Sequence, residues 1–373
     1  MPKNRLDYGA TIGIIGGGQL GRMMATTARH MGYRLIVLDP TPDCPAAQLA
    51  DEQLVANYDD QLAIEQLANK ADVVTYEFEN VDLQAARYLE AKGLLPQGAH
   101  SLEITQDREL EKRAMVASGQ SVAPFLIIKT KADLQRAVNE VGYPAVVKTC
   151  RGGYDGKGQH KVKTEHDLVA VETMLAANER LIYEGYIPFD CEISVVFTRS
   201  LAGEIVFFPI GENIHRDHIL HTTTVPATVA PGVVDKARTA AHAIAEEIGV
   251  VGTFTLELFV RNNDIYINEL APRPHNSGHF TIEACNVSQF EQHIRAICGL
   301  PLAPVHFHGG AIMLNLLGDN IADAFAKIDQ LPLAQIHMYG KAEIKPKRKV
   351  GHMTFVGQSR DELVALLTKE NLI

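Results

Sequence analysis

Lysine and glycine residues stand together near the middle of the sequence. Lys148 ends an apolar run, and Arg151-Gly-Gly-Tyr-Asp-Gly-Lys-Gly-Gln159 follows it. The segment is not a Walker A loop, because no Gly-Lys-Ser/Thr closes it and a strand-like run comes next. A glycine loop between two strands can fold over phosphates and offer backbone N–H groups, while Lys148 and Lys157 neutralise charge. A surface hairpin loop with solvated lysines is the structural alternative.

Two carboxylates flank a predicted hairpin turn further along the chain. Glu257 and Glu269 lie in two apolar, strand-like runs on either side of residues 262–264. A three-residue loop at 262–264 would place the two carboxylates opposite each other on one face. Paired carboxylates repel unless a cation lies between them, and Mg²⁺ held by one or two carboxylates plus substrate phosphates fits that geometry. Two exposed acids at a sheet edge are the alternative, favoured if either side chain faces solvent.

A second glycine motif lies near the N-terminus. Gly16-x-Gly18-x-x-Gly21 follows a short apolar strand and opens an amphipathic helix, and Asp39 ends the next strand. This outline matches a dinucleotide fingerprint, in which the acid binds the ribose. An NAD-dependent oxidoreductase is therefore one hypothesis. A glycine turn that lets a strand and a helix pack closely is the other.

The elements that carry these motifs change character along the chain. Short strands between helices over residues 10–100 predict an open parallel α/β sheet. Residues 101–300 combine helices with antiparallel strand pairs, which is typical of an α+β domain. Strand-like runs recur after residue 300. We therefore predict domains at 1–100, 101–300 and 301–373, the last small and β-rich.

Composition excludes several classes of protein. The net charge of −10 does not favour non-specific nucleic-acid binding. No apolar stretch approaches the ~20 residues of a membrane span, and the N-terminus shows no targeting segment. The five cysteines form no CxxC pair, so we expect reduced thiols and a cytoplasmic location.

Several motifs together resemble the ATP-grasp ligases, and most closely the 5-(carboxyamino)imidazole ribonucleotide synthase family. The resemblance extends from the first glycine loop to Met353. The matching segments are Ile14-Ile-Gly-Gly-Gly-Gln-Leu-Gly-Arg-Met23, Thr75-Tyr-Glu-Phe-Glu-Asn-Val81, Gly153–Gln159, Asn268-Glu-Leu-Ala-Pro-Arg-Pro-His-Asn-Ser-Gly-His279, Tyr339-Gly-Lys341 and Arg348-Lys-Val-Gly-His-Met353. The Ala271–His279 run is highly specific to this branch. The implied fold is a Rossmann-like N-terminal domain, a central ATP-grasp domain and a small β-rich C-terminal domain.

The resemblance implies an ATP site between two sheets. Arg108 and Lys148 would contact the phosphates beneath the 153–159 loop. The loop residues are Gly153, Tyr154, Asp155, Gly156, Lys157, Gly158 and Gln159. Other nucleotide contacts would come from the adenine-lining segment Glu184, Gly185, Tyr186 and Ile187, from Glu192 at the ribose, and from His215. Glu257 and Glu269 would bind Mg²⁺, with Asn268 nearby. Many ATP-grasp enzymes carry Asn at the position of Ala271. The closer branch has Ala there, as this chain does.

The resemblance also implies a second substrate, aminoimidazole ribonucleotide. Arg273, Lys341 and Arg348 suit its phosphate, since Arg binds phosphate in a bidentate manner. The family pattern places Glu77, Tyr154, His275, Asn276 and Ser277 around the same substrate. Structural alternatives remain. His275 and His279 could be capping or turn residues, Tyr154 could anchor the loop, and Lys345, Lys347 and Lys349 fit a solvated charge run.

The implied reaction makes carboxyphosphate from ATP and bicarbonate and transfers its carboxyl group to the exocyclic amine. Lys148, Asp155 as proton acceptor, and Arg273 form the expected catalytic set. A homodimer and a hand-off of product to a mutase follow from the family. The alternatives are a formate-dependent glycinamide ribonucleotide transformylase, the NAD-dependent oxidoreductase, and a nucleotide-binding regulator without turnover.

Overall fold

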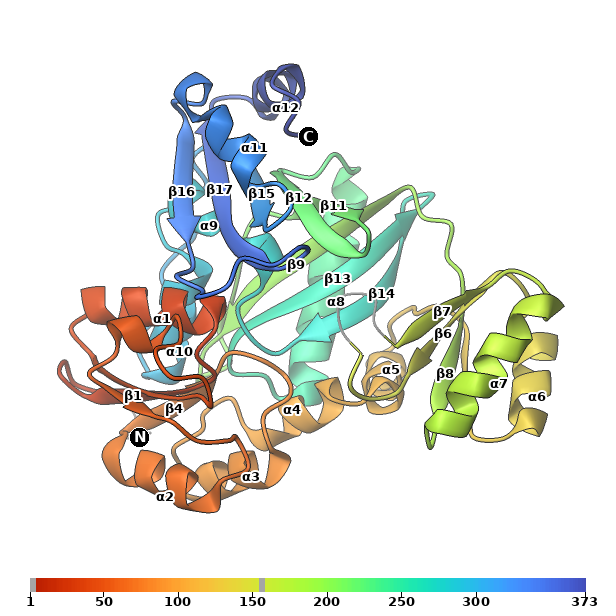
Figure 1. Cartoon of the computed structure of the whole chain (residues 1–373), viewed down its shortest axis with the longest axis horizontal. Helices are drawn as coiled ribbons and strands as arrows, with labels where there is room; N and C mark the ends of the chain where they lie inside the picture. The colour runs from red at the N-terminus through yellow and green to blue at the C-terminus, as the bar shows by residue number, and fades with distance from the viewer. Residues whose placement is uncertain (1–4, 154–157) are drawn as a thin grey trace.

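The computed structural model describes residues 5–153 and 158–373, and this part of the chain folds around three β-sheets (Figure 1). The N-terminal sheet is parallel, in the order β3-β2-β1-β4. Its strands are β1 (Thr11–Ile15), β2 (Arg34–Leu38), β3 (Glu52–Leu54) and β4 (Val73–Tyr76), with η1 (Ala47–Leu49), α1 (Gln19–His30), α2 (Gln61–Lys70) and α3 (Leu83–Ala91) around them. The alternation of short apolar strands with helices correctly predicted this parallel arrangement.

Two short helices lead into the central region. The sequence predicted one helix over residues 102–118, whereas the chain forms α4 (Ala99–Thr105) and α5 (Arg108–Ala117). The break falls at Asp107, whose side chain caps α5 by accepting the N–H of Glu109 at 3.1 Å. Capping starts a new helix at this position and directs Arg108 into its first turn.

The small sheet of the central region is antiparallel, in the order β5-β8-β6-β7. Its elements are β5 (Phe125–Ile128), α6 (Lys131–Val141), β6 (Ala145–Thr149), β7 (Gln159–Val162), η2 (Glu165–Asp167), α7 (Leu168–Ala177) and β8 (Leu181–Gly185). Strands β6 and β7 pair from Ala145↔Val162 to Lys148↔Gln159, which confirms that the glycine loop joins two strands. Residues 154–157 of that loop lie outside the described residues.

The large sheet has the order β14-β13-β9-β11-β12-β15-β17-β16, with β10 on the side of β9. Its strands are β9 (Cys191–Arg199), β10 (Ile205–Phe207), β11 (Gly211–Arg216), β12 (Ile219–Val225), β13 (Gly252–Arg261), β14 (Asp264–Ala271), β15 (Gly310–Leu317), β16 (Ala334–Met338) and β17 (Lys349–Gly357). The helices that follow or flank them are α8 (Pro231–Ile248), η3 (Asn276–Gly278), α9 (Thr281–Ala284), α10 (Gln289–Ile297), α11 (Ile321–Ala326), η4 (Ile328–Gln330) and α12 (Arg360–Lys369). The C-terminal strands thus extend the sheet of the central region through the β12–β15 pair.

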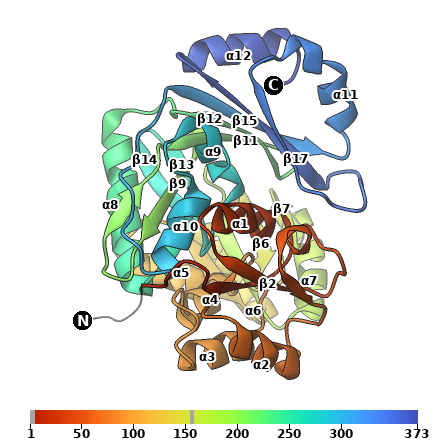
Figure 2. The same cartoon turned by 90° about the vertical axis from the view of Figure 1, so that its left-hand side faces the viewer.

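Packing connects the regions. Helix α8 lies along β9 and β13 and buries its apolar face there. Helix α10 packs with α1 in one apolar cluster, and Figure 2 shows the two helices side by side. Tyr339 from the C-terminal part joins the same cluster. The N-terminal sheet is therefore fixed to both later parts of the chain.

The five cysteines lie within the described residues and are free thiols, as expected. Within residues 5–153 and 158–373, no helix has the length and apolar character needed to cross a membrane.

Candidate active site

The register of one hairpin brings Glu257 and Glu269 together. A three-residue loop was predicted here, but the turn has two central residues, Asn262 and Asn263, both with positive φ. Such a turn would pair Glu257 with Asn268 in a regular ladder. A bulge between Glu257 and Leu258 shifts the register, so that Glu257 faces Glu269. The predicted pairing is confirmed, and its predicted cause is wrong.

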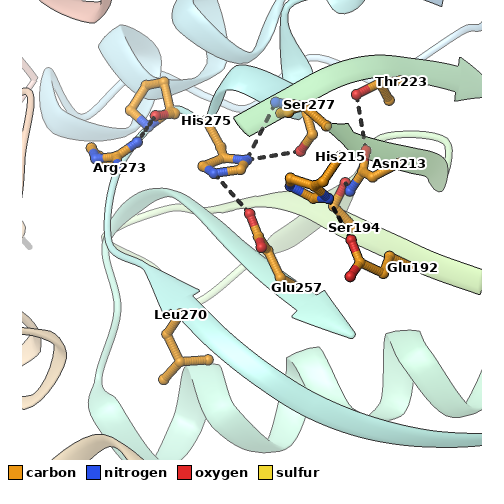
Figure 3. Close-up of polar contacts among 12 residues, drawn as sticks. Glu192, Ser194, Asn213, His215, Thr223, Glu257, Leu270, Arg273, His275 and Ser277 are labelled. Atoms are coloured by element: carbon orange, nitrogen blue, oxygen red, sulfur yellow. Dashed lines mark hydrogen bonds and ion pairs between the residues drawn. The ribbon is translucent and has the colours of Figure 1, made fainter. Parts of the chain in front are cut away.

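The two carboxylates differ in their surroundings. Glu257 is 23% exposed and accepts a hydrogen bond from His275 Nε2 at 3.0 Å (Figure 3). Burial alone would raise the pKa of Glu257, but the hydrogen bond and charge of His275, together with His215, lower it to about 2. Glu269 is exposed, yet desolvation and the negative charge of Glu257 raise its pKa. Two exposed acids at a sheet edge were the predicted alternative to a metal site, to be favoured if either side chain faced solvent. The exposure of Glu269 meets that condition.

One carboxylate of the small sheet is buried between two lysines. Glu184 lies between Lys148, at 2.6 Å, and Lys112, at 3.2 Å. Burial would raise the pKa of Glu184, but the two ammonium groups lower it to about 2. Lys112 also donates to the carbonyls of Ile267 and Asn268, at 3.3 and 2.8 Å, and so connects the small sheet to β14. Glu184 was expected only as part of the adenine-lining segment, and its side-chain pairing with both lysines was not predicted.

Arg108 lies at the base of the glycine loop. Its guanidinium donates to the carbonyls of Thr149 at 2.9 Å and Gly153 at 3.2 Å. Gly158 has a φ of +72° at the other end of the loop, and Gln159 contacts His218 at 3.3 Å. Tyr154, Asp155, Gly156 and Lys157 lie outside the described residues, so their predicted roles stay predictions.

The expected adenine segment ends strand β8. The N–H groups of Gly185 and Tyr186 already donate to the carbonyls of Pro124 and Pro144, at 2.8 and 2.9 Å. Ile187 is buried. Any contact with an adenine edge therefore falls to the remaining backbone groups of this segment.

Glu192 and His215 form an ion pair across the β9–β11 side of the large sheet (Figure 3). Burial would lower the pKa of His215, but the hydrogen bond and charge of Glu192 raise it. This pair and the Glu257–His275 pair lie close together in Figure 3.

The segment after β14 carries the expected substrate residues. Arg273 pairs with Glu79 at 2.6 Å and donates to the carbonyl of Pro274 at 3.0 Å. His275 caps the η3 turn, because its Nδ1 accepts the N–H of Ser277 at 3.3 Å. The capping alternative is therefore confirmed for His275, which also contacts Glu257. Asn276 is buried, and its side-chain amide has no hydrogen-bond partner among the described residues.

Lys341 and Arg348, two of the residues expected at the phosphate of the second substrate, lie in the C-terminal part of the chain. Lys341 donates to the carbonyl of Lys349 at 2.8 Å, and neighbouring Gly340 accepts a hydrogen bond from Gln48 of the N-terminal region at 3.0 Å. Arg348 is exposed and lies 3.8 Å from Glu343. No contact joins Arg348 to Arg273 among the described residues.

The predicted run of solvated lysines is confirmed for Lys345 and Lys347 but not for Lys349. Lys345 and Lys347 are exposed and pair with Glu343 and Asp217 at 2.5 and 3.0 Å. Lys349 is only partly exposed, and its charge lowers the pKa of Glu257. It is the first residue of β17 and so belongs to the sheet rather than to the exposed run before it.

The first glycine loop binds carboxylates of the chain itself. Glu77 accepts the N–H groups of Gly18 and Gly21, the latter at 2.6 Å. Asp39 accepts the N–H of Gly17 at 2.7 Å and is buried. A dinucleotide would need these same donors, so the NAD hypothesis is not favoured.

Sequence reasoning missed Lys112, Glu79 and Glu111. Lys112 lies one helical turn after Arg108, and Glu79 lies two residues after Glu77, so spacing could have indicated both. Glu111 accepts the N–H of Leu270 at 2.7 Å, and burial and Glu269 raise its pKa to about 8. No sequence pattern marks Glu111 as buried.

Known families match the chain along most of its length. The ribonucleotide synthetase preATP-grasp domain matches residues 9–106, and the ATP-grasp domain matches residues 113–290. The phosphoribosylaminoimidazole carboxylase C-terminal domain matches residues 311–365. N5-carboxyaminoimidazole ribonucleotide synthase of Bacillus subtilis is 47% identical over 371 residues, which cover 99% of this chain and 97% of that protein. The chain belongs to the N5-carboxyaminoimidazole ribonucleotide synthase family.

Solved structures of the family superpose closely. An ADP complex of N5-carboxyaminoimidazole ribonucleotide synthetase, purK, is 44% identical with a TM-score of 0.96, covering 100% of this chain and 98% of the other. The enzyme of Aspergillus clavatus, in complex with ADP and 5-aminoimidazole ribonucleotide, is 29% identical with a TM-score of 0.90, covering 97% of each chain. These matches confirm the ATP-grasp fold and the resemblance that the motifs predicted.

Proposed function

We propose that this protein carboxylates the exocyclic amine of 5-aminoimidazole ribonucleotide, with ATP and bicarbonate as co-substrates. The observation that carries the proposal is the full-length similarity to relatives named for this product. The reaction belongs to the ATP-dependent ligases that form a C–N bond. It would supply N5-carboxyaminoimidazole ribonucleotide for purine biosynthesis.

The first step forms carboxyphosphate. A bicarbonate oxygen attacks the γ-phosphorus of ATP, the bond to the β-phosphate oxygen breaks, and ADP leaves. Lys148 places a positive charge on this side of the cleft, and Arg108 lies at the base of the loop that would cover the phosphates. Catalysis of such a transfer depends mainly on positioning and electrostatic stabilisation.

The second step transfers the carboxyl group. The amine nitrogen attacks the carbonyl carbon of carboxyphosphate, or CO₂ released from it, and phosphate departs. The nitrogen gives up a proton, and we assign its acceptance to Asp155, which lies outside the described residues. Arg273, held by Glu79 and by its own bond to Pro274, is suited to the substrate's phosphate.

The residues present fit a magnesium ion. Glu257 and Glu269 face each other, and desolvation together with the negative charge of Glu257 raises the pKa of Glu269. When bound with ATP, Mg²⁺ would neutralise phosphate charge at the transferred group. The proposed ligands are these two carboxylates and substrate oxygens, with Asn268 adjacent in the bulge.

The remaining expectations are part of the same proposal. A cytoplasmic location, a homodimer and delivery of the product to a mutase are usual for the family. The decisive experiment measures ADP release with Mg-ATP and bicarbonate, with and without 5-aminoimidazole ribonucleotide. A large increase that requires both bicarbonate and the nucleotide is expected. Stimulation by formate with glycinamide ribonucleotide instead would indicate the transformylase alternative.

A further inference from the structure

Two buried glutamines hold the backbone of the segment that carries Arg273. Pro272 and Pro274 lack N–H groups, so this segment has few donors with which to fix itself to the sheet. Gln97 Nε2 donates to the carbonyl of Pro272 at 3.0 Å. Gln289 accepts the N–H of His275 at 2.9 Å and donates to the His275 carbonyl at 2.7 Å. Side chains from two distant parts of the chain thus hold both ends of the segment.

Gln289 is the stronger of the two clamps because it makes both bonds to one residue. It is fully buried on α10, where a competing water is excluded. Its amide oxygen and nitrogen bind the N–H and C=O of His275 as a neighbouring β-strand would. His275 in turn donates to Glu257, so the clamp sets the position of that contact.

Gln97 is oriented by a buried chain of hydrogen bonds. The N–H of Thr253 donates to His293 Nδ1 at 3.1 Å, which leaves the proton of the neutral imidazole on Nε2. His293 Nε2 then donates to Thr75 Oγ1 at 2.8 Å, and the Thr75 hydroxyl donates to Gln97 Oε1. Burial lowers the pKa of His293 to about 3, so the ring is neutral under ordinary conditions. Only the amide nitrogen of Gln97 is left to face Pro272.

The two glutamines are connected through one strand. Thr253 lies on β13, four residues before Glu257, and its hydroxyl donates to the backbone carbonyl of Gln289 at 2.9 Å. The same residue begins the chain that orients Gln97. The strand with the proposed metal ligand therefore shares a rigid polar network with the segment that carries Arg273.

We propose that Gln97 and Gln289 are positioning residues, which hold Arg273 and His275 in place for the phosphorylated acceptor. This inference rests on the proposed function, because it assigns Arg273 to the acceptor's phosphate. The glutamines do not touch substrate and act through the backbone of the segment from Pro272 to His275.

The chain offers a matched control on the same helix. Gln292 is buried on α10 and makes the same two-bond clamp, to the N–H and carbonyl of Ala303 at 3.1 and 2.6 Å. Ala303 lies in the connection that leads to β15, outside the segment that carries Arg273. Gln292→Met and Gln289→Met therefore remove the same pair of side-chain bonds to backbone, with different predicted consequences, and Gln289→Met also removes a 3.3 Å contact with His279 Nδ1.

The experiment compares KM values for ATP and for 5-aminoimidazole ribonucleotide in Gln97→Met, Gln289→Met and Gln292→Met. We expect the first two variants to raise KM for the ribonucleotide by about tenfold or more, with KM for ATP changed less than about twofold. Gln292→Met should change neither. Gln289→Glu keeps the side-chain volume and accepts the His275 N–H but cannot donate, so it replaces Gln289→Met if that variant does not fold.

A double-mutant cycle tests whether Gln97 acts through Arg273. Gln97→Met should raise KM little further when Arg273→Lys is already present. Fully additive effects, or equal changes in both KM values, would overturn the positioning role. If wild-type protein shows no turnover that depends on the ribonucleotide, both proposals fail. Normal wild-type turnover with an unchanged KM in Gln289→Met or Gln289→Glu overturns this inference alone.

Discussion

At the scale of single residues, Lys112 and Lys148 hold the same carboxylate and yet serve different purposes. The Lys148 side chain is 18% exposed, whereas Lys112 is 2% exposed and bonds to backbone carbonyls of β14. Both lysines compensate Glu184, but Lys148 alone of the two retains access to a solute. Substitution of each lysine should therefore have a different effect.

Replacing Lys148 with Met should abolish phosphate stabilisation while leaving the fold intact, because Lys112 still compensates Glu184. We expect kcat/KM for ATP to fall by about a hundredfold, as for loss of one preorganised donor. Lys112→Met should instead lower the free energy of unfolding by about 3 kcal/mol, because Lys112 is buried and also donates to the carbonyls of Ile267 and Asn268, which lose their donor although Lys148 still compensates Glu184. Steady-state kinetics and urea unfolding distinguish the two variants. A Lys148→Met protein with unchanged kcat/KM would contradict the assignment.

His215 gives the protein a pH dependence of known sign. Its pKa is raised above the usual 6.5 by Glu192, so the stabilisation is fully present below pH 6.5 and is lost as pH rises through the higher folded-state pKa. His215→Gln should therefore lower the urea midpoint more at pH 6 than at pH 9. His100→Gln, at an exposed position on α4, is the control. An equal loss at both pH values would show that His215 contributes no charge.

At the scale of elements, the sequence predicted the strands around the site better than it predicted their register. Apolar runs and glycines located β6, β7, β13 and β14, because these patterns are local. The bulge that pairs Glu257 with Glu269 depends on Leu258 and Ile267 both joining the core under α8, which is a tertiary requirement. No strand was predicted where β8 lies, and the ion pair of Glu184 was not foreseen because its partner Lys112 comes from another element.

The tip of the β13–β14 hairpin should tolerate glycine and reject a branched side chain. Asn263 has a φ of +65°, a region that costs about 1–2 kcal/mol for most L-residues. Asn263→Val should lower the free energy of unfolding by about 1 kcal/mol, while Asn263→Gly should change it little. Chemical denaturation of both variants checks this expectation. Equal stability of the two would mean that the turn relaxes to another conformation.

At the scale of the whole molecule, the large sheet continues from the proposed metal ligands to the C-terminal strands. Strand β12 pairs with β15 from Thr222↔Leu314 to Val225↔Ala311. Ala311 and Met313 also share an apolar cluster with Val196 and Phe208 of the central region. Changes in sequence pattern near residue 300 indicated a new region but could not show that its strands join an existing sheet.

A chain that ends at His308 should therefore fail to fold as a soluble protein. It would expose the β12 edge and the apolar cluster that β15 covers, which favours aggregation. A chain that ends at Gln358 lacks α12 but keeps every described strand pairing, and it should retain its sheet. Circular dichroism and soluble yield compare the two chains. A soluble, folded product from the shorter chain would identify residues 309–373 as an independent domain.

The first glycine loop has a consequence for how solutes compete for it. Glu77 is a tethered ligand for the amides of Gly18 and Gly21, with an effective concentration of about millimolar or higher whatever the cell contains. A dinucleotide would have to displace the Glu77 side chain from these amides. The loop is therefore blocked toward the dinucleotides for which its glycine spacing is typical. In other sequences with this spacing, an acid directly after the strand on the other side of the first strand, as Glu77 follows β4, would indicate an occupied loop, whereas an acid after the second strand is part of the dinucleotide pattern itself.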